Sequence, residues 1–300
     1  MLSLRERMPF HFIKLRKIWY IFSSVLIIPG LIFLFSQGLQ LGIDFTGGNL
    51  MDLRFNQATS VEQVREVLSG CGLGDSSIQQ SGETDFIIRT SELSEDQNIN
   101  LVQALKANFG EFTILRNERV GPIMGRELLN KALGALVVAS ILMIFYISWR
   151  FEFKQGLAAV LGLLHNVLFV LGVFSIFQLE VDSAFVAAIL TIIGYSINDT
   201  IVIFDRIREN MLNKKKGEIL EDVINMSLWQ TLARSINTVL TVVMVLVALL
   251  LLGGTTIHNM VLALLIGVVC GAYTSICIAS PLWYEMKKLE TRPKTKAARV

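Results

Sequence analysis

Charged residues are scarce in this sequence. Only 17% of its 300 residues are charged, while 53% are hydrophobic. Soluble domains usually carry about 25% charged residues, so this shortage excludes an ordinary soluble domain and indicates a membrane protein. The 27 basic and 25 acidic residues nearly balance, and no excess of one sign points to nucleic acid as a partner.

Cysteine is also rare, and its spacing matches no metal site. Cys71 stands alone, whereas Cys270 and Cys277 lie seven residues apart in one apolar run. Metal-binding cysteines come in closer pairs, so we interpret all three as small packing residues and expect no metal or other cofactor. The segment between the first two apolar runs contains no histidine and no nucleophile beside a base. We therefore expect no enzyme.

Long apolar runs are abundant. A helix needs about 20 apolar residues to cross a bilayer, and six runs are long enough: 18–35, 132–149, 156–177, 183–204, 235–252 and 261–284. The first run follows a basic segment but is too long for a cleaved signal and lacks a cleavage site, so we expect it to remain as an anchor. The prediction is a polytopic α-helical membrane protein with six transmembrane helices.

The short loops agree on one orientation. Lys and Arg gather at 150–154, 206–216 and 285–300, whereas loops 178–182 and 253–260 contain neither. Because basic short loops stay in the cytoplasm, both termini are predicted to be cytoplasmic. The expected parts are a basic N-terminus (1–17), helix 1 (18–36), an extracytoplasmic domain (37–126), helices 2–6 (127–284) and a basic tail (285–300).

The segment between helices 1 and 2 has the pattern of a small water-exposed domain. Residues 49–55 alternate as in a strand, and Ser60 with Gln63 forms a capping box before a helix that Gly70 and Gly72 end. A turn at 81–84 predicts a hairpin, a second helix stops at Gly110, and 112–120 reads as a last strand. The order β-α-β-β-α-β predicts a ferredoxin-like α+β domain.

Two ionisable residues in the predicted spans are candidates for function, because such groups are costly in a bilayer. Asp199 lies six residues, or about 9 Å, inward from Asp205 on a helix. Arg234 opens the fifth span from the same side, so the two could meet as a pair in which Asp199 alternates between an ionised state held by Arg234 and a protonated state. The plainer alternatives are a structural acid near a helix end and an ordinary basic flank.

His165 is a third candidate, near the middle of the third span and next to Asn166. An imidazole there could shuttle protons. The alternative is a packed, neutral histidine that is hydrogen-bonded to a neighbouring helix.

Five motifs in order around the six spans resemble one family. They are GIDFTGG at 42–48, VGP at 120–122, GYSINDT at 194–200, FDRIREN at 204–210 and QTLAR at 230–234. Together they resemble the SecF subunits of bacterial SecD–SecF protein-export complexes, which are related in fold to RND transporters. The chain departs from the family where His-Asp is common in the third span, because it has His165-Asn166.

The resemblance implies an auxiliary subunit of the Sec preprotein translocase in the bacterial cytoplasmic membrane, driven by the proton motive force. It implies SecD, a YajC-like subunit, the SecYEG translocon with SecA, unfolded preprotein and membrane lipids as partners. Asp199 and Arg234 would form the proton relay, with His165 as a further candidate. The motif residues Gly42, Asp44, Phe45, Thr46, Gly47 and Gly48 would form a hinge that transmits movement, and the alternative is a turn without that role.

Two other functions remain open from the residues themselves. One is an RND-type half-transporter of a small lipophilic substrate, and the other is a non-conducting scaffold subunit of the translocon. In the scaffold, the charges inside the membrane would be packing pairs.

Overall fold

The computed structural model describes residues 10–150 and 152–291, which fall into two compact units. The helical unit takes in the described parts of Met1–Leu39, Leu136–Leu179 and Ala184–Val300. The second unit comprises Gln40–Ala135 and, from a distant part of the chain, Glu180–Ser183.

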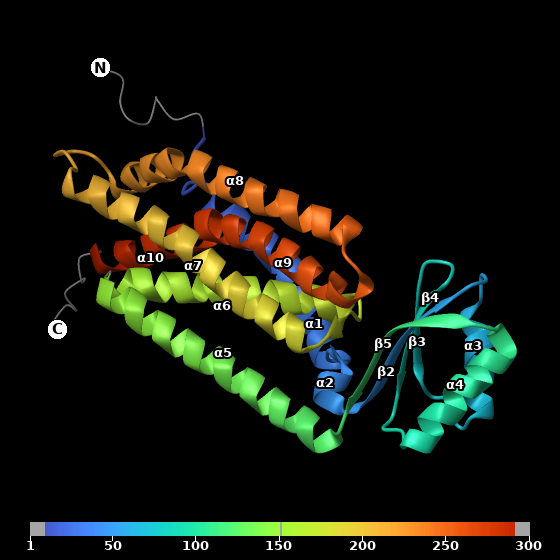
Figure 1. Cartoon of the computed structure of the whole chain (residues 1–300). Helices are drawn as coiled ribbons and strands as arrows, with labels where there is room; N and C mark the ends of the chain where they lie inside the picture. The colour runs from blue at the N-terminus through green and yellow to red at the C-terminus, as the bar shows by residue number, and fades with distance from the viewer. Residues whose placement is uncertain (1–9, 151, 292–300) are drawn as a thin grey trace. The chain divides into compact units, whose positions relative to one another are not determined.

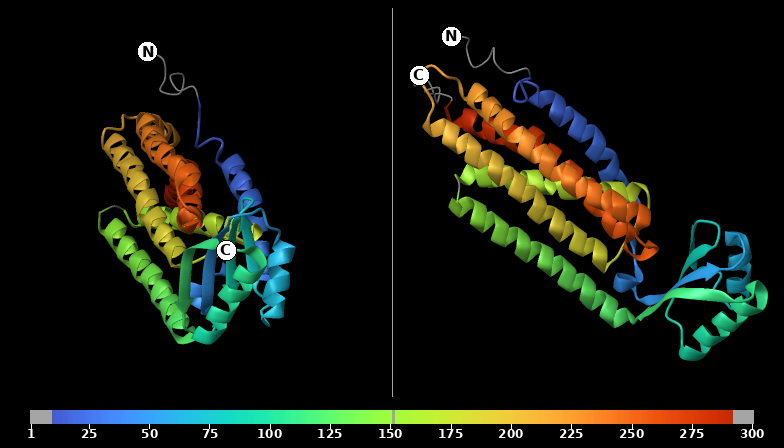
Figure 2. Two further views of the ribbon diagram at one scale, coloured as in Figure 1. Left: turned by 45° about the vertical axis from the view of Figure 1, so that its right-hand side comes forward. Right: turned by 45° about the horizontal axis from the view of Figure 1, so that its top comes forward.

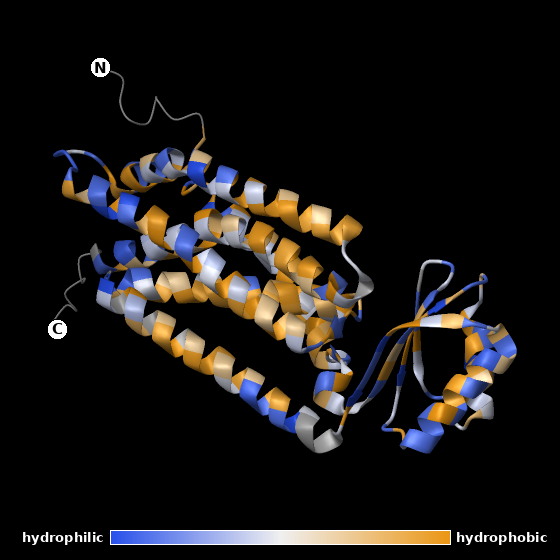
Figure 3. Cartoon of the chain, viewed as in Figure 1, coloured by the Kyte–Doolittle hydropathy of each residue, from blue (hydrophilic) through white to orange (hydrophobic). Residues whose placement is uncertain are grey.

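Long helices make up the helical unit, and they lie side by side in Figures 1 and 2. They are α1 (Arg16–Ser36), the C-terminal part of α5 (Pro122–Arg150), α6 (Phe153–Ile176), α7 (Ser183–Leu212), α8 (Leu220–Leu252), α9 (Thr255–Thr274), a π-helical turn η2 (Ser275–Ala279) and α10 (Ser280–Thr291). Six helical stretches in the described chain are long and apolar enough to cross a membrane. Their hydrophobic colouring is plain in Figure 3.

Several helices extend beyond the apolar runs that predicted them. Helix α7 continues to Leu212 and α8 begins at Leu220, although the runs covered 183–204 and 235–252. The early turns of α8 bury Val223, Ile224 and Leu228 at helical spacing, so packing continues the helix where hydropathy falls. The last predicted span is also not one regular helix, because η2 interrupts it between α9 and α10.

Small residues let the helices approach closely. A Cβ atom on Gly30 of α1 would lie 2.7 Å from the Cα of Gly172 on α6, which only two glycines can accommodate. At Gly271 of α9 a Cβ would lie 3.1 Å from the Asn166 amide nitrogen. Close packing of this kind fixes the rotation of each helix, and hence which polar side chains meet.

An antiparallel sheet with the order β3-β4-β2-β5 forms the second unit. Its elements are β2 (Gly48–Phe55), α3 (Val61–Gly70), β3 (Ser77–Ser81), β4 (Asp85–Thr90), α4 (Glu95–Phe109) and β5 (Phe112–Val120). The apolar face of the sheet packs against α3 and α4 (Figure 1), with a core that includes Leu53, Phe55, Leu68, Phe86 and Leu101. The predicted capping box of Ser60 and Gln63 is present.

Short elements precede this sheet along the chain. β1 (Gln40–Leu41) pairs in parallel with β6 (Glu180–Val181), and α2 (Ile43–Thr46) lies between β1 and β2. The sequence predicts only a short loop between two spans at 178–182. In the structure, Glu180 and Val181 of this segment form a strand with Gln40 and Leu41, which precede the sheet along the chain.

Candidate proton-relay site and coupling motif

Asp199 sits on α7 with one carboxylate oxygen paired and the other unpaired. Its Oδ1 accepts a hydrogen bond of 2.5 Å from the Ser235 hydroxyl on α8. Its Oδ2 is buried and has no hydrogen-bond partner among the described residues. A buried polar atom without a partner is unfavourable and often marks a functional group. Asp199 therefore stays a candidate for function.

Arg234 comes near Asp199 without pairing with it. Both residues line a cavity of about 60 Å³ between α7 and α8. Among the described residues, Ser235 supplies the hydrogen bond to Asp199, and no ion pair joins Asp199 to Arg234. Successive side chains on a helix point about 100° apart. Because α8 is rotated so that Ser235 faces Asp199 on α7, the side chain of Arg234 points to one side. The sequence did not indicate Ser235 as the hydrogen-bond partner of Asp199, although Ser235 directly follows Arg234.

A larger cleft shares two lining residues with this cavity. Its volume is about 590 Å³, and it is lined by residues at the C-terminal ends of α5 and α7 and by α8, including Arg150, Asp205 and Gln230. Val202 and Arg234 line both the cleft and the cavity. Arg234 thus borders both the charged cleft and the cavity that Asp199 lines.

A second polar cluster includes Thr200, the residue that follows the candidate acid on α7. The hydroxyls of Thr200 and Ser275 are 2.8 Å apart, and the Ser275 hydroxyl also donates to the Gly271 carbonyl at 3.0 Å. Ser275 begins the π-helical turn, whose carbonyl at Ser275 accepts a 2.9 Å bond from the Ser280 hydroxyl. Such turns are frequent at functional sites. Nothing in the hydropathy of the last span indicated it.

His165 belongs to a different cavity. Its Nδ1 lies 3.1 Å from the Thr274 hydroxyl on α9, while Nε2 is buried without a partner among the described residues. It lines an apolar cavity of about 480 Å³ with residues of α1 and α9, and Asp199 is not part of that lining. Neighbouring Asn166 is buried and donates to the Gly267 carbonyl at 3.2 Å. The structure therefore does not bring His165 into the cavity of Asp199 and Arg234.

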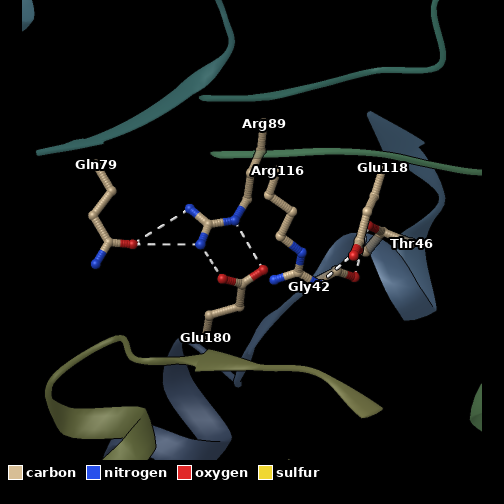
Figure 4. Close-up of polar contacts among 7 residues, drawn as sticks. All are labelled: Gly42, Thr46, Gln79, Arg89, Arg116, Glu118 and Glu180. Atoms are coloured by element: carbon tan, nitrogen blue, oxygen red, sulfur yellow. Dashed lines mark hydrogen bonds and ion pairs between the residues drawn. The ribbon is translucent and has the colours of Figure 1, made fainter. Parts of the chain in front are cut away.

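The glycine-rich motif forms a compact turn between β1 and β2. Gly47 and Gly48 have φ values of 77° and 129°, which side chains rarely adopt, and a Cβ on Gly48 would also collide with the Thr90 carbonyl. The Thr46 hydroxyl donates to the Gly42 carbonyl at 3.1 Å (Figure 4). Phe45 is buried, with 4% of its surface exposed.

Asp44 of the same motif reaches the first residue of α7. Its Oδ2 accepts hydrogen bonds from the Ser183 backbone N–H at 2.9 Å and from the Ser183 hydroxyl at 2.5 Å. A carboxylate in this position satisfies a free N–H at the helix start and interacts well with the helix dipole. The sequence placed Asp44 in the motif but gave no sign of this contact.

Comparisons with protein families, with individual proteins and with solved structures all find SecD, SecF or SecDF proteins. The family described as "Protein export membrane protein SecD/SecF, C-terminal" matches residues 100–289, and the "SecD/SecF GG Motif" matches residues 32–59. The SecF subunit of Acidaminococcus fermentans is 42% identical, over 93% of this chain and 98% of that protein. The SecDF subunit of Bacillus subtilis is 42% identical, over 94% of this chain and 38% of that protein.

A solved structure agrees with these relatives. The crystal structure of SecDF from Thermus thermophilus, described as a translocon-associated membrane protein, superposes with a TM-score of 0.87 at 34% identity. The match covers 93% of this chain and 39% of that one, so this chain spans about two fifths of the solved protein. On the extent of these matches, the chain belongs to the SecD/SecF family of protein-export membrane proteins.

Proposed function

We propose that this protein is an auxiliary subunit of the Sec preprotein translocase that works with SecD and uses the proton motive force to promote late translocation. The names of the relatives, protein translocase subunits SecF and SecDF, support the export role. The use of a proton gradient rests on one observation, the carboxylate of Asp199 with an unpaired oxygen beside a cavity within a membrane span.

Proton exchange at Asp199 would change the contacts between α7 and α8. An ionised Asp199 accepts a hydrogen bond from the Ser235 hydroxyl. It also attracts the positive charge of Arg234, which lines the same cavity. Protonation removes that attraction and turns the carboxyl group into a donor. Because Arg234 borders both the cavity and the charged cleft, protons would reach Asp199 from that side. The two helices would then shift with each proton.

The same proposal gives the chain its orientation. Both termini and the basic loops would be cytoplasmic, in the bacterial cytoplasmic membrane, because the loops that lack Lys and Arg alternate with those that have them. The sheet unit would lie outside, as a domain between α1 and α5. Its order β3-β4-β2-β5 with two helices supports the ferredoxin-like description. There it would meet the emerging, unfolded preprotein.

SecD is the partner that the chain's relatives favour most. In Bacillus subtilis one SecDF chain is more than twice as long as the region that matches here, so SecD would supply the remainder. Helix α5 has an apolar face open to a partner or to lipid, since Leu133, Val137, Ile141 and Phe145 each expose more than half of their surface. The SecYEG translocon with SecA and a YajC-like subunit are further partners on this proposal.

An Asp199→Asn variant, assembled with SecD, tests the relay. Gradient-dependent preprotein translocation in membrane vesicles should be lost, because the amide cannot ionise, while the amount of assembled complex stays unchanged. The Thr191→Ala variant is the control, since it removes an exposed hydroxyl from the same helix that bonds only to its own backbone. Full gradient-dependent translocation by Asp199→Asn would reject the relay and favour a scaffold.

A further inference from the structure

The segment Glu180–Ser183 belongs to two parts of the molecule at once. Along the chain it connects α6, which ends at Ile176, to α7, which begins at Ser183. By its contacts it belongs to the unit that holds the sheet. We call these four residues the connecting segment.

Backbone hydrogen bonds hold the connecting segment to the chain before the sheet. β6 lies parallel to β1, with Gln40 opposite Glu180 and Leu41 opposite Val181. The ladder continues into the glycine-rich motif, where the Gly42 N–H donates to the Val181 carbonyl at 2.8 Å. Two residues of ladder are too short to be stable alone, so side chains must contribute.

Arg89 on β4 supplies the strongest of these side-chain contacts (Figure 4). Its Nε donates to Glu180 Oε1 at 2.8 Å, and its Nη2 donates to Oε2 of the same carboxylate. Gln79 on β3 accepts from both terminal nitrogens of Arg89 at 3.4 Å. The Arg89 and Glu180 side chains expose only 10% and 11% of their surface. A two-point ion pair that is shielded in this way fixes geometry as well as charge.

Gly42 is explained by this ion pair. Its φ of −72° is open to any residue, so conformation does not require glycine. A Cβ at this position, however, would lie 2.7 Å from Glu180 Oε1. A larger residue here would push the Glu180 carboxylate away from its observed position, so glycine leaves room for the ion pair with Arg89.

Arg116 on β5 adds a second positive charge close to the segment. Its hydrogen bond to Glu118, 2.6 Å long and drawn in Figure 4, raises the pKa of Arg116, and the carboxylates of Asp182 and Asp44 raise it further. Asp44 also binds the start of α7 through Ser183. The unit that holds the sheet thus binds the connecting segment at Glu180, Val181 and Ser183.

We propose that Arg89 and Glu180 are positioning residues that clamp the connecting segment to the sheet, so that the start of α7 moves together with this domain. The inference rests on the proposed function, because α7 also carries Asp199. That residue follows Ser183 by 16 positions, about 24 Å along a helix. The clamp would make α7 the direct link between proton exchange and movement of the domain, in addition to the covalent links through α1 and α5.

Removal of either partner breaks a two-point ion pair whose side chains are only 10% and 11% exposed, so the geometry that the pair fixes is lost. The variants Arg89→Gln and Glu180→Gln should therefore release the segment. Arg54→Gln is the matched control, since Arg54 makes a two-point ion pair with Asp85 on the same sheet, away from the segment. All variants are assembled with SecD and compared at equal amounts of complex.

The expected result is uncoupling. Proton flux through the Arg89→Gln and Glu180→Gln complexes should stay near that of Arg54→Gln, while gradient-dependent translocation is lost. Amide hydrogen exchange of residues 180–186 should also become faster. Translocation equal to that of Arg54→Gln would overturn the clamp. Joint loss of flux and translocation would overturn it too, because that result indicates a general structural role.

The Asp199→Asn complex, measured beside these variants, separates the two proposals. If it keeps gradient-dependent translocation, the proton relay fails. The clamp fails on its own if Asp199→Asn abolishes translocation but the Arg89 and Glu180 variants do not.

Discussion

At the scale of single residues, two arginines of the four-stranded sheet form ion pairs that differ in their exposure to solvent. Arg54 and Asp85 pair at 2.7 and 2.8 Å, but the Arg54 side chain is 55% exposed. Arg89 and Glu180 make a similar pair that is almost fully covered. Water screens the first pair, so it adds little to stability, whereas the second pair is shielded from water. Similar chemistry therefore has different consequences in the two places, and only the second pair is suited to fix the position of a neighbouring segment.

The exposed pair predicts a pH dependence. Its hydrogen bonds from Arg54 hold the pKa of Asp85 below its usual value. Stabilisation by Asp85 is thus complete above its ordinary pKa of about 3.9 and is lost as the pH falls through the lower folded value. In detergent-solubilised protein, Asp85→Asn should speed hydrogen exchange of β4 slightly at pH 6, and the difference should vanish at pH 2, after correction for intrinsic rates. Exposed Glu83→Gln is the control, and a difference unchanged at pH 2 would contradict the assignment.

At the scale of elements, both helices of the sheet unit start with the same device. Ser60 and Ser94 each accept a hydrogen bond from the backbone N–H three residues on, and the side-chain oxygens of Gln63 and Gln97 accept one from the backbone N–H of the capping serine. The first box was predicted from the sequence, and the second follows the same spacing. These local contacts set where α3 and α4 begin and so help to place their apolar faces on the sheet.

Ser60→Ala should destabilise the start of α3 by about 1 kcal/mol, the usual value for a lost N-cap. Hydrogen exchange of the α3 amides should become about fivefold faster, and those of α4 should be unchanged. Ser69→Ala, in the last turn of the same helix, is the control, because this hydroxyl bonds only to the Arg65 carbonyl. Equal rates in Ser60→Ala and Ser69→Ala would show that the cap contributes nothing.

At the scale of the whole molecule, the three cysteines can report orientation. Cys71 is exposed at the end of α3, whereas Cys270 and Cys277 are buried among the helices. A maleimide that cannot cross membranes should label Cys71 in intact spheroplasts. Lys215→Cys in a Cys71→Ser background should be labelled only after permeabilisation, since Lys215 lies in the exposed, basic loop after α7. The reverse pattern would invert the proposed topology.

The sequence by itself determined the parts that depend on local patterns. Six apolar runs predicted the spans, and alternation with turn residues predicted the strands at 49–55 and 112–120, which the structure places at Gly48–Phe55 and Phe112–Val120. Asp199 could be selected as well, because an acid within an apolar run is unfavourable wherever the helix lies. Each of these signals is contained in a few neighbouring residues.

Only the tertiary structure decided which distant residues meet. It gave Asp199 the hydroxyl of Ser235 as its partner, and it placed His165 in a separate cavity. It also joined Glu180 to Arg89, which lies 91 residues earlier in the chain. Such contacts depend on helix rotation, where one residue changes direction by about 100°, and on strand register, where one residue reverses the face. No single segment of sequence contains that information.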